Sequence, residues 1–100
     1  PAAPAVEVVA LRVFQEALAN VRKHASARTV EASLGYEPEA LRLSVRDDGR
    51  GFDPAAPRDG FGIDGMSSRV REAGGAFDLA SAAGEGTRLV VLLPTVEEAR

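Results

Sequence analysis

The spacing of apolar residues changes near residue 28, and this change restricts the fold. Over residues 5–25 apolar side chains recur every three to four positions, as in an amphipathic helix. The residues expected on the buried face of this helix are Ala10, Leu11, Phe14, Ala17, Leu18, Val21 and Ala25. Residues 29–36 and 41–46 instead alternate apolar with polar side chains, which indicates two half-buried strands. The turn residues between them, 37–39, predict an antiparallel hairpin.

The second half of the chain repeats this order of elements. Residues 47–62 are dense in Asp, Gly and Pro, which excludes a regular helix or strand. A helix is predicted over residues 63–73, ended by the glycines at 74–75. A short strand follows around 77–79, and the apolar run 89–93 predicts a strand buried on both faces. The expected fold is therefore α+β, a two-layer sandwich in which helices cover one face of a mixed, mostly antiparallel sheet.

Composition narrows the class of protein and its partners. A chain of 100 residues with 45% hydrophobic and 27% charged residues is expected to form one ordered domain, residues 1–100. The formal charge of −3 argues against nucleic acid or an anionic membrane surface as a partner. No apolar run reaches the roughly 18 residues of a membrane span, so no direct membrane contact is expected.

Two further features bear on the setting of the domain. The chain contains no cysteine, which excludes disulfides, thiolate metal sites and cysteine nucleophiles, and which is typical of a cytoplasmic domain. Its first residues, Pro-Ala-Ala-Pro, carry no initiating methionine and no leader before the helical pattern begins. We therefore expect the chain to be a fragment of a longer protein.

The first polar cluster lies on the opening helix. Glu16 and Asn20 are four residues apart and thus lie one turn apart on the same face. Lys23 and His24 fall close to the same angular position. An amide oxygen such as that of Asn20 suits Mg²⁺, which prefers hard oxygen ligands. The alternative is an ordinary solvated helix face.

Two glycine-rich segments follow a predicted strand and precede the second helix. Gly49 and Gly51 allow a positive φ or the close approach of a planar ligand, while Asp47 can accept a hydrogen bond from an exocyclic amine. Gly60 and Gly62 precede a helix whose N-terminal amides favour phosphate. The alternatives are an ordinary Asp/Gly turn and a flexible hinge. A fourth segment, residues 84–87, could equally be a tight hairpin turn.

Taken together, the four segments resemble the nucleotide-binding motifs of two-component sensor histidine kinases. Residues 14–25 (FQEALANVRKHA) resemble the N box, and residues 47–52 (DDGRGF) the first glycine box. Residues 60–66 (GFGIDGM) and 84–87 (GEGT) resemble the second and third glycine boxes, in the family's order. The N box and the second glycine box are similar to those of the nitrate-sensor and desaturase-sensor subfamily. The resemblance implies the Bergerat ATP-binding fold of the GHKL superfamily, truncated at its N-terminus.

The resemblance implies a metal and phosphate site on the first helix. The amide of Asn20 would coordinate the Mg²⁺ that bridges the phosphates of ATP, which makes Asn20 both a catalytic and a metal-binding candidate. Glu16 would organise the metal shell as the second catalytic candidate. Lys23 or His24 would contact phosphate oxygens.

The adenine site is implied by the first and third glycine boxes. Asp47 would bind the amino group of the base, and Gly49 and Gly51 would let the backbone pass close to it. Gly86 and Thr87 would close the far side of the pocket.

The lid over the phosphates is implied by the second glycine box. Gly60 and Gly62, with Ile63 directly after them, would flank a lid formed by residues 52–59. That segment is short and contains two prolines, so weak nucleotide affinity is expected for the isolated domain.

The implied activity is that of a protein-histidine kinase module that supplies the γ-phosphoryl group of Mg-ATP. His24 is the only histidine and lies in the N box, so the acceptor is expected on the dimerisation and phosphoacceptor domain of the parent protein. A response regulator would act downstream, the parent could be a membrane-bound sensor, and the fragment alone is expected to be inactive. The alternatives are an anti-sigma-factor-like serine kinase and a degenerate nucleotide-binding module.

Overall fold

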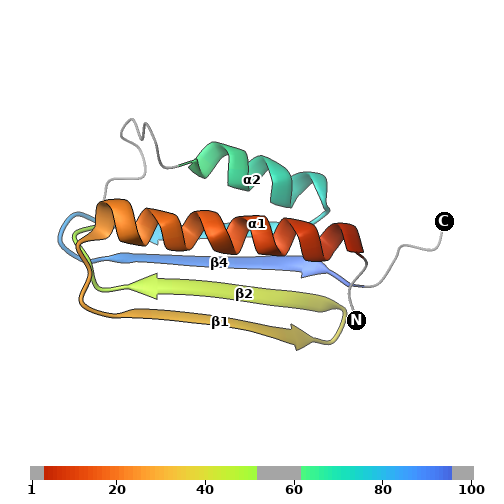
Figure 1. Ribbon diagram of the computed structural model, residues 1–100. Coiled ribbons are helices and arrows are strands. Elements are labelled where there is room, and N and C mark those ends of the chain that lie inside the picture. The colour runs from red at the N-terminus through yellow and green to blue at the C-terminus, as the bar shows by residue number, and fades with distance from the viewer. Residues whose placement is uncertain (1–3, 52–61, 96–100) are drawn as a thin grey trace.

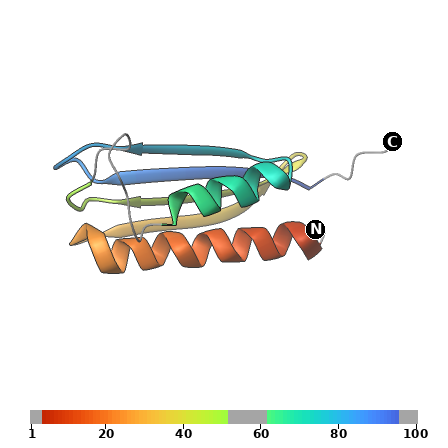
Figure 2. The same cartoon turned by 90° about the horizontal axis from the view of Figure 1, so that it is seen from above.

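A computed structural model of the chain describes residues 4–51 and 62–95. The elements are α1 (Pro4–Asn20), the π-helical turn η1 (Val21–Ala25), β1 (Val30–Glu37), β2 (Ala40–Asp47), α2 (Ile63–Glu72), β3 (Ala76–Ser81) and β4 (Thr87–Pro94). Both helices lie on the same face of the sheet (Figure 1), and the view from above shows the two layers (Figure 2). The expected α+β sandwich is thus confirmed. No helix in the described ranges has the length and apolar character needed to cross a membrane.

The four strands pair in the order β1-β2-β4-β3, and each described pair is antiparallel. The expected hairpin of β1 and β2 is confirmed, with Leu34 opposite Leu43. Because β2 and β4 occupy the centre, residues from the two halves of the chain lie side by side there. Leu43 is opposite Val91 across that central pair.

The core lies between the helices and the inner face of the two central strands. α1 packs against β2, β4 and α2. The buried apolar residues are Ala10, Val13, Ala17, Leu41, Leu43, Val45, Ile63, Met66, Val70, Leu89, Val91 and Leu93. Each fully buried aliphatic side chain contributes about 1.5–3 kcal/mol relative to an exposed one.

The buried face of α1 differs from the expected one. Val13 is 0% exposed although it was not expected in the stripe, whereas Leu11 is 57% and Leu18 is 38% exposed. Apolar residues occupy two adjoining faces of α1, and on both faces they recur every three to four positions. Their spacing therefore does not show which of the two faces is buried. The face carrying Ala10 and Ala17 is the one that packs on the sheet, where alanines allow a close approach of the helix.

The apolar run of β4 was expected to be buried on both faces, and this was wrong. Leu89, Val91 and Leu93 are buried, but Val90 and Leu92 between them are only half-buried. The reason is that the helices cover one face of the sheet, so alternate residues of β4 point to the uncovered face.

The predicted first helix has the expected length, but its last turn is wound differently. α1 ends at Asn20 and continues as the π-helical turn η1, and Ser26 directly after this turn has a left-handed conformation with φ of 52°. Turns of this type are rare and occur frequently at functional sites. The N box motif therefore includes a change in helical winding.

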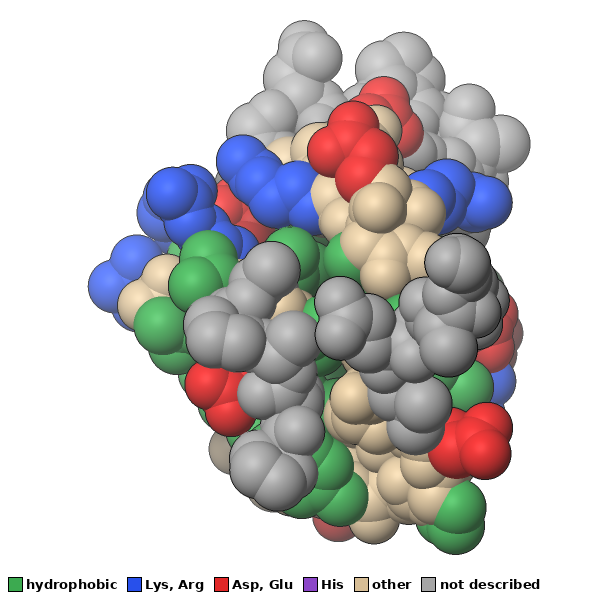
Figure 3. Space-filling view, turned by 90° about the vertical axis from the view of Figure 1, so that its right-hand side faces the viewer, with side chains coloured by type: hydrophobic (Ala, Val, Ile, Leu, Met, Phe, Trp, Pro, Cys, Tyr) green, Lys and Arg blue, Asp and Glu red, His purple; other side chains and the backbone are tan. Residues whose placement is uncertain are grey.

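The end of the molecule that carries the start of α1 and the end of α2 is shown in Figure 3. There, charged side chains of both signs are interspersed, with apolar side chains visible between them. The described parts of the four sequence motifs lie at the opposite end of the molecule, where α1 ends and α2 begins.

Candidate functional site

Four segments that are far apart in the sequence meet at one end of the sandwich (Figure 1). They are the C-terminal end of α1 with η1, the end of β2, the start of α2 and the connection from β3 to β4. The strand register aligns four residues in one row across the sheet at this end: Val30, Asp47, Thr87 and Ser81. The sheet thus brings residues of the first and third glycine boxes into direct neighbourhood.

Asp47 ends β2 and turns its side chain to the inner face of the sheet. It is 7% exposed and is the one buried charged residue among those described. Its Oδ1 accepts a hydrogen bond of 2.7 Å from the backbone N–H of Gly49. Burial of a carboxylate is unfavourable unless polar partners compensate, and the N–H of Gly49 is one such partner.

The adjacent Asp48 has a separate, structural task. Its Oδ1 accepts hydrogen bonds from the backbone N–H of Arg28 at 2.9 Å and of Thr29 at 3.0 Å. These bonds, that of Thr29 foremost, lower the pKa of Asp48 below its ordinary value although desolvation opposes the shift. Asp48 therefore ties the segment before β1 to the end of β2, while Asp47 faces inward.

The loops that follow β2 and β3 pack backbone against backbone. Gly51 and Gly86 have φ of 64° and 77°. A Cβ atom on Gly86 would overlap the carbonyl oxygen of Asp47, and one on Gly51 would overlap that of Ala82. The N–H of Gly84 donates a hydrogen bond of 2.6 Å to the carbonyl oxygen of Arg50. Gly51 has the positive φ that was expected, and Gly51 and Gly86 allow the two loops to contact each other. The close approach of a planar ligand stays a prediction.

Two hydroxyl groups lie beside Asp47 on the inner face of the same row. Thr87 begins β4 directly opposite Asp47, and Ser81 ends β3 directly opposite Thr87. The hydroxyl oxygens of Ser81 and Thr87 are 2.8 Å apart, and the Ser81 hydroxyl donates to the carbonyl oxygen of Gly86 at 2.9 Å. Ser81 was not expected from the sequence. Its position on the strand facing Thr87 across the predicted hairpin is the signal that could have revealed it.

A cavity of about 300 Å³ borders this row of residues. It is lined by Arg46, Asp47, Ala80, Ser81, Ala82, Glu85, Gly86, Thr87 and Arg88. Arg46, Arg88 and Ala80 form the neighbouring row of the register, so their side chains lie on the uncovered face of the sheet and the cavity extends to that face.

The candidate phosphate site lies where α1 approaches the start of α2. Glu16 and Asn20 are half-buried on α1, and Lys23 is exposed on η1. Gly62 has φ of 68°, and a Cβ atom there would lie 2.6 Å from Oε2 of Glu16. The Glu16 carboxylate therefore lies directly against the residue that precedes α2. The structure thus joins the N box to the second glycine box.

The remaining candidates are placed only in part. Gly60 and the lid segment 52–59 lie outside the described residues, as does the side chain of His24. Ile63 is buried in the core, so its side chain packs between the layers and only its backbone can face a ligand. Gly62 caps α2 without a side-chain hydrogen bond.

The described donor set fits a metal that a nucleotide carries. Among described residues no group of three or more His, Asp or Glu side chains is arranged to hold a metal ion. Mg²⁺ is commonly bound by one or two protein oxygens together with substrate phosphates and waters. Asn20, half-buried on α1, carries one such amide oxygen.

The family comparison agrees with this geometry. The model of the histidine kinase-, DNA gyrase B- and HSP90-like ATPases matches residues 5–97. The sensor histidine kinase LiaS of Bacillus subtilis is 37% identical over 94 residues, which cover 93% of this chain and 26% of that protein. The signal transduction histidine-protein kinase/phosphatase UhpB of Salmonella typhimurium is 40% identical over 87 residues, which cover 87% of this chain and 17% of that protein. The chain thus spans about a quarter or less of these relatives.

Solved structures share the fold. The ATP binding domain of PrrB from Mycobacterium tuberculosis has a TM-score of 0.69 and 25% identity, covering 88% of this chain and 68% of that one. The blue-light activated histidine kinase of Erythrobacter litoralis EL346 has a TM-score of 0.68 and 25% identity, covering 83% of this chain and 28% of that one. The family match, the relatives and the shared fold together assign the chain to the histidine kinase-, DNA gyrase B- and HSP90-like ATPases, of which it is an ATP-binding domain of the histidine kinase type.

Proposed function

We propose that this domain binds Mg-ATP and presents its γ-phosphoryl group for transfer to a histidine on another domain of the parent protein. The observation that carries the proposal is the buried carboxylate of Asp47, which stands directly opposite Thr87 at the end of the sheet where the sequence motifs meet. An ionised carboxylate only accepts hydrogen bonds. It is therefore suited to the exocyclic amine of adenine, which donates two.

The glycines next to Asp47 support a flat ligand. Gly49 is buried and holds the carboxylate through its N–H, so it fixes the direction in which Asp47 accepts further bonds. Gly51 and Gly86 keep the two loops in contact without side chains between them. We propose that the base lies against this backbone, with Asp47 on one side and Thr87 on the other.

The phosphates are proposed to extend from the base toward α1. Asn20 would offer its amide oxygen to Mg²⁺, which would neutralise charge on the phosphates when bound. Glu16 would orient the groups around that amide from one turn earlier on α1. Lys23 and His24 on η1 would contact phosphate oxygens. Phosphoryl transfer to an imidazole needs positioning and charge neutralisation rather than a hydrolytic water, so no base role is assigned to Glu16.

The start of α2 is proposed to serve the same phosphates. The N-terminus of a helix offers backbone amides and the positive end of the helix dipole to an anion. Gly60 and Gly62 would flank the lid, and Ile63 would contribute its backbone N–H while its side chain stays in the core.

The acceptor and the partners belong to the parent protein. Since His24 is the only histidine of the chain and is assigned to phosphate contact, the acceptor is proposed to lie on the dimerisation and phosphoacceptor domain. A response regulator would receive the phosphoryl group next. The relatives are named as sensor kinases or as kinase/phosphatases of signal transduction, which supports this assignment.

Nucleotide binding is tested by replacing one of two adjacent aspartates. Asp47→Asn should lower the affinity for Mg-ATP at least tenfold, because the amide presents a donor where the adenine amine needs an acceptor. Asp48→Asn is the matched control: it removes the same charge one residue away and should leave affinity nearly unchanged, since Asp48 serves the backbone of residues 28 and 29. Titration calorimetry measures both. Equal affinity of Asp47→Asn and the unmodified chain would refute the adenine site.

The transfer step is tested in the parent protein with γ-labelled ATP. The label should appear on a histidine outside this domain, in an acid-labile form, and should disappear with Asn20→Ala. Acid-stable label on serine would favour the anti-sigma-factor-like kinase instead. Binding of ATP without any label would favour the degenerate module.

A further inference from the structure

We infer that the uncovered face of the sheet is a docking surface for an acidic segment of a protein partner. The segment lies in an extended conformation along β2 and places its carboxylates on Arg42, Arg46 and Arg88. This face is the one opposite to α1 and α2 (Figure 1), and none of the four sequence motifs includes these arginines. The inference goes beyond the nucleotide site and does not rest on it.

The uncovered face contains a hollow that follows from the strand register. The middle row of the face carries short side chains, with Ser44 of β2 opposite Val90 of β4. The rows on either side of it carry arginines, Arg46 opposite Arg88 in one row and Arg42 in the other. Long side chains therefore border short ones, and the hollow between them has a volume of about 340 Å³.

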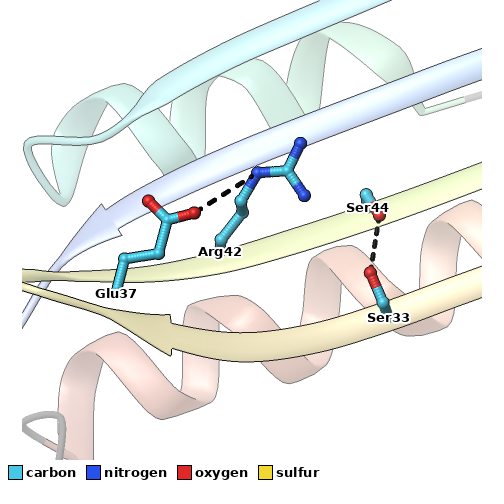
Figure 4. Close-up of polar contacts among 4 residues, drawn as sticks. All are labelled: Ser33, Glu37, Arg42 and Ser44. Carbon is cyan, nitrogen blue, oxygen red and sulfur yellow. Dashed lines mark hydrogen bonds and ion pairs between the residues drawn. The ribbon is translucent and has the colours of Figure 1, made fainter.

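The hollow is lined mainly by hydrogen-bond donors. Figure 4 shows its floor, where the hydroxyl oxygens of Ser33 and Ser44 are 2.8 Å apart. Because one hydroxyl of such a pair donates to the other, the second keeps its proton for a further acceptor. The guanidinium groups of the three arginines can only donate, and Glu31 is the one acidic side chain in the lining. This set of donors suits a carboxylate, which only accepts.

Two of the arginines face each other without a counter-charge. Arg46 and Arg88 are exposed and stand directly opposite each other on the two central strands. Among the described residues neither of them forms an ion pair, whereas Nε of Arg42 lies 3.6 Å from Oε2 of Glu37. Like charges in opposite positions destabilise a sheet. A carboxylate bound between the two guanidinium groups would remove that repulsion.

Other side chains of the same face favour a narrow protein segment. Glu31, Glu37 and Asp78 border the arginines, and the chain as a whole has a formal charge of −3. The extended phosphate arrays of a nucleic acid or a membrane would meet these carboxylates, whereas a single peptide strand covers the arginines alone. Val90 and Leu92 are half-buried on this face. Arginine around apolar side chains is typical of protein–protein interfaces.

The spacing of the arginines specifies the spacing of the acidic residues. Arg42 and Arg46 are four residues apart on β2, which corresponds to roughly 13 Å in a strand. In an extended peptide every second side chain lies on the same face, so acidic residues at positions i and i+4 match this distance. Acidic residues at i and i+3 would lie on opposite faces. The two spacings therefore distinguish a fitted segment from a general attraction of negative charge.

The experiment uses two fluorescent peptides of identical composition. One carries glutamates at i and i+4 with a valine midway between them, and the other carries the glutamates at i and i+3. Fluorescence anisotropy measures their binding to the chain at an ionic strength of about 0.1 M, where the Debye length is about 10 Å. The first peptide should bind roughly two- to fivefold more tightly than the second, which corresponds to one surface ion pair.

Charge-matched variants locate the binding surface. The double variant Arg46→Gln, Arg88→Gln should weaken binding of the first peptide roughly two- to twentyfold, as expected for two surface ion pairs. The control double variant Arg12→Gln, Arg69→Gln removes the same charge from exposed positions of α1 and α2. Because these positions lie on the far side of the sheet, the control should change the dissociation constant less than twofold.

A third variant measures the repulsion itself. Arg88→Glu places opposite charges across β2 and β4, so it should raise the melting temperature by roughly 1–8 °C and weaken binding of the first peptide. A structural role of Arg88 would instead give a lower melting temperature. A binding surface that is strained in the isolated domain thus differs measurably from a structural one.

Each remaining outcome overturns the inference. It is refuted if neither peptide binds, if both bind equally, or if the control variant weakens binding as much as the double variant at Arg46 and Arg88. A lower melting temperature of Arg88→Glu refutes it as well. If a labelled single-stranded oligonucleotide binds more tightly than the first peptide and loses affinity in the same double variant, the face recognises nucleic acid and the inference is wrong.

Discussion

Alanine at Gly86 should be far more disruptive than alanine at Gly84, two residues away in the same loop. Both glycines have a positive φ, 77° at Gly86 and 81° at Gly84. A Cβ atom at Gly84 would meet nothing within 4 Å, whereas one at Gly86 would overlap the carbonyl oxygen of Asp47 and lie 3.2 Å from the Cα of Asp48. The two substitutions therefore share the backbone cost and differ in the steric one.

The magnitudes can be assigned separately. A left-handed backbone costs a non-glycine residue about 1–2 kcal/mol, and this applies to both variants. Overpacking against the backbone of β2 adds about 1–3 kcal/mol at Gly86 alone. Since a domain of this size has a free energy of unfolding of roughly 5–15 kcal/mol, Gly86→Ala should remove a substantial part of it. The melting temperature should fall by at least about 4 °C more than for Gly84→Ala.

The assay is urea unfolding of the two variants followed by far-ultraviolet circular dichroism, with thermal melting in parallel. Nucleotide affinity, measured on the folded fraction, should also fall for Gly86→Ala because the end of β2 that carries Asp47 must move. Equal destabilisation of the two variants would refute the close approach of the two loops. A stable Gly84→Ala, with no loss at all, would refute the backbone cost.

Two further predictions concern the core and the pH response. Val13→Ala should lower the free energy of unfolding by about 1.5–3 kcal/mol, because the Val13 side chain is 0% exposed. Leu11→Ala should change it by less than about 0.5 kcal/mol, because the Leu11 side chain is 57% exposed. Urea unfolding measures both variants, and a larger effect at Leu11 would contradict the observed orientation of α1. Asp48 has a lowered pKa in the folded chain, so its contribution to stability is present above the unfolded pKa of about 3.9 and is lost as the pH falls through the lower folded value. Urea midpoints measured from pH 6 downward should therefore decline less steeply for Asp48→Asn; parallel curves would contradict the role of its bonds to residues 28 and 29.

Much of the fold was predictable because its signals are local. The alternation in residues 29–36 and 41–46, with turn residues between them, specified the hairpin of β1 and β2. The glycines at 74–75 marked the end of α2 to within one residue. Apolar period alone could not say which of two adjoining apolar faces of α1 packs on the sheet. That choice depends on how closely the helix can approach, and the small Ala10 and Ala17 favour the face around Val13.

The order of the motifs indicated which residues of the candidate site would lie together, while their roles in binding stay predictions. Asp47, Gly51 and Gly86 do meet at one end of the sheet. Motif spacing did not indicate Ser81, since its place beside Thr87 depends on the pairing of β3 with β4. The different tasks of Asp47 and Asp48 were also hidden, because adjacent strand residues point to opposite sides and only the register shows which one is buried.

The π-helical turn at Val21–Ala25 has a consequence for reading related sequences. A helical wheel assumes one constant rotation per residue, and this segment changes its rotation directly after Asn20. The side chains of residues that align along the N box can therefore point in different directions if one relative forms an α-helical turn here and another forms a π-helical turn. Whether a residue of another chain is equivalent to Lys23 or His24 depends on the helical winding as well as on the alignment. A single inserted or deleted residue in this turn could redirect both side chains without altering the composition of the motif.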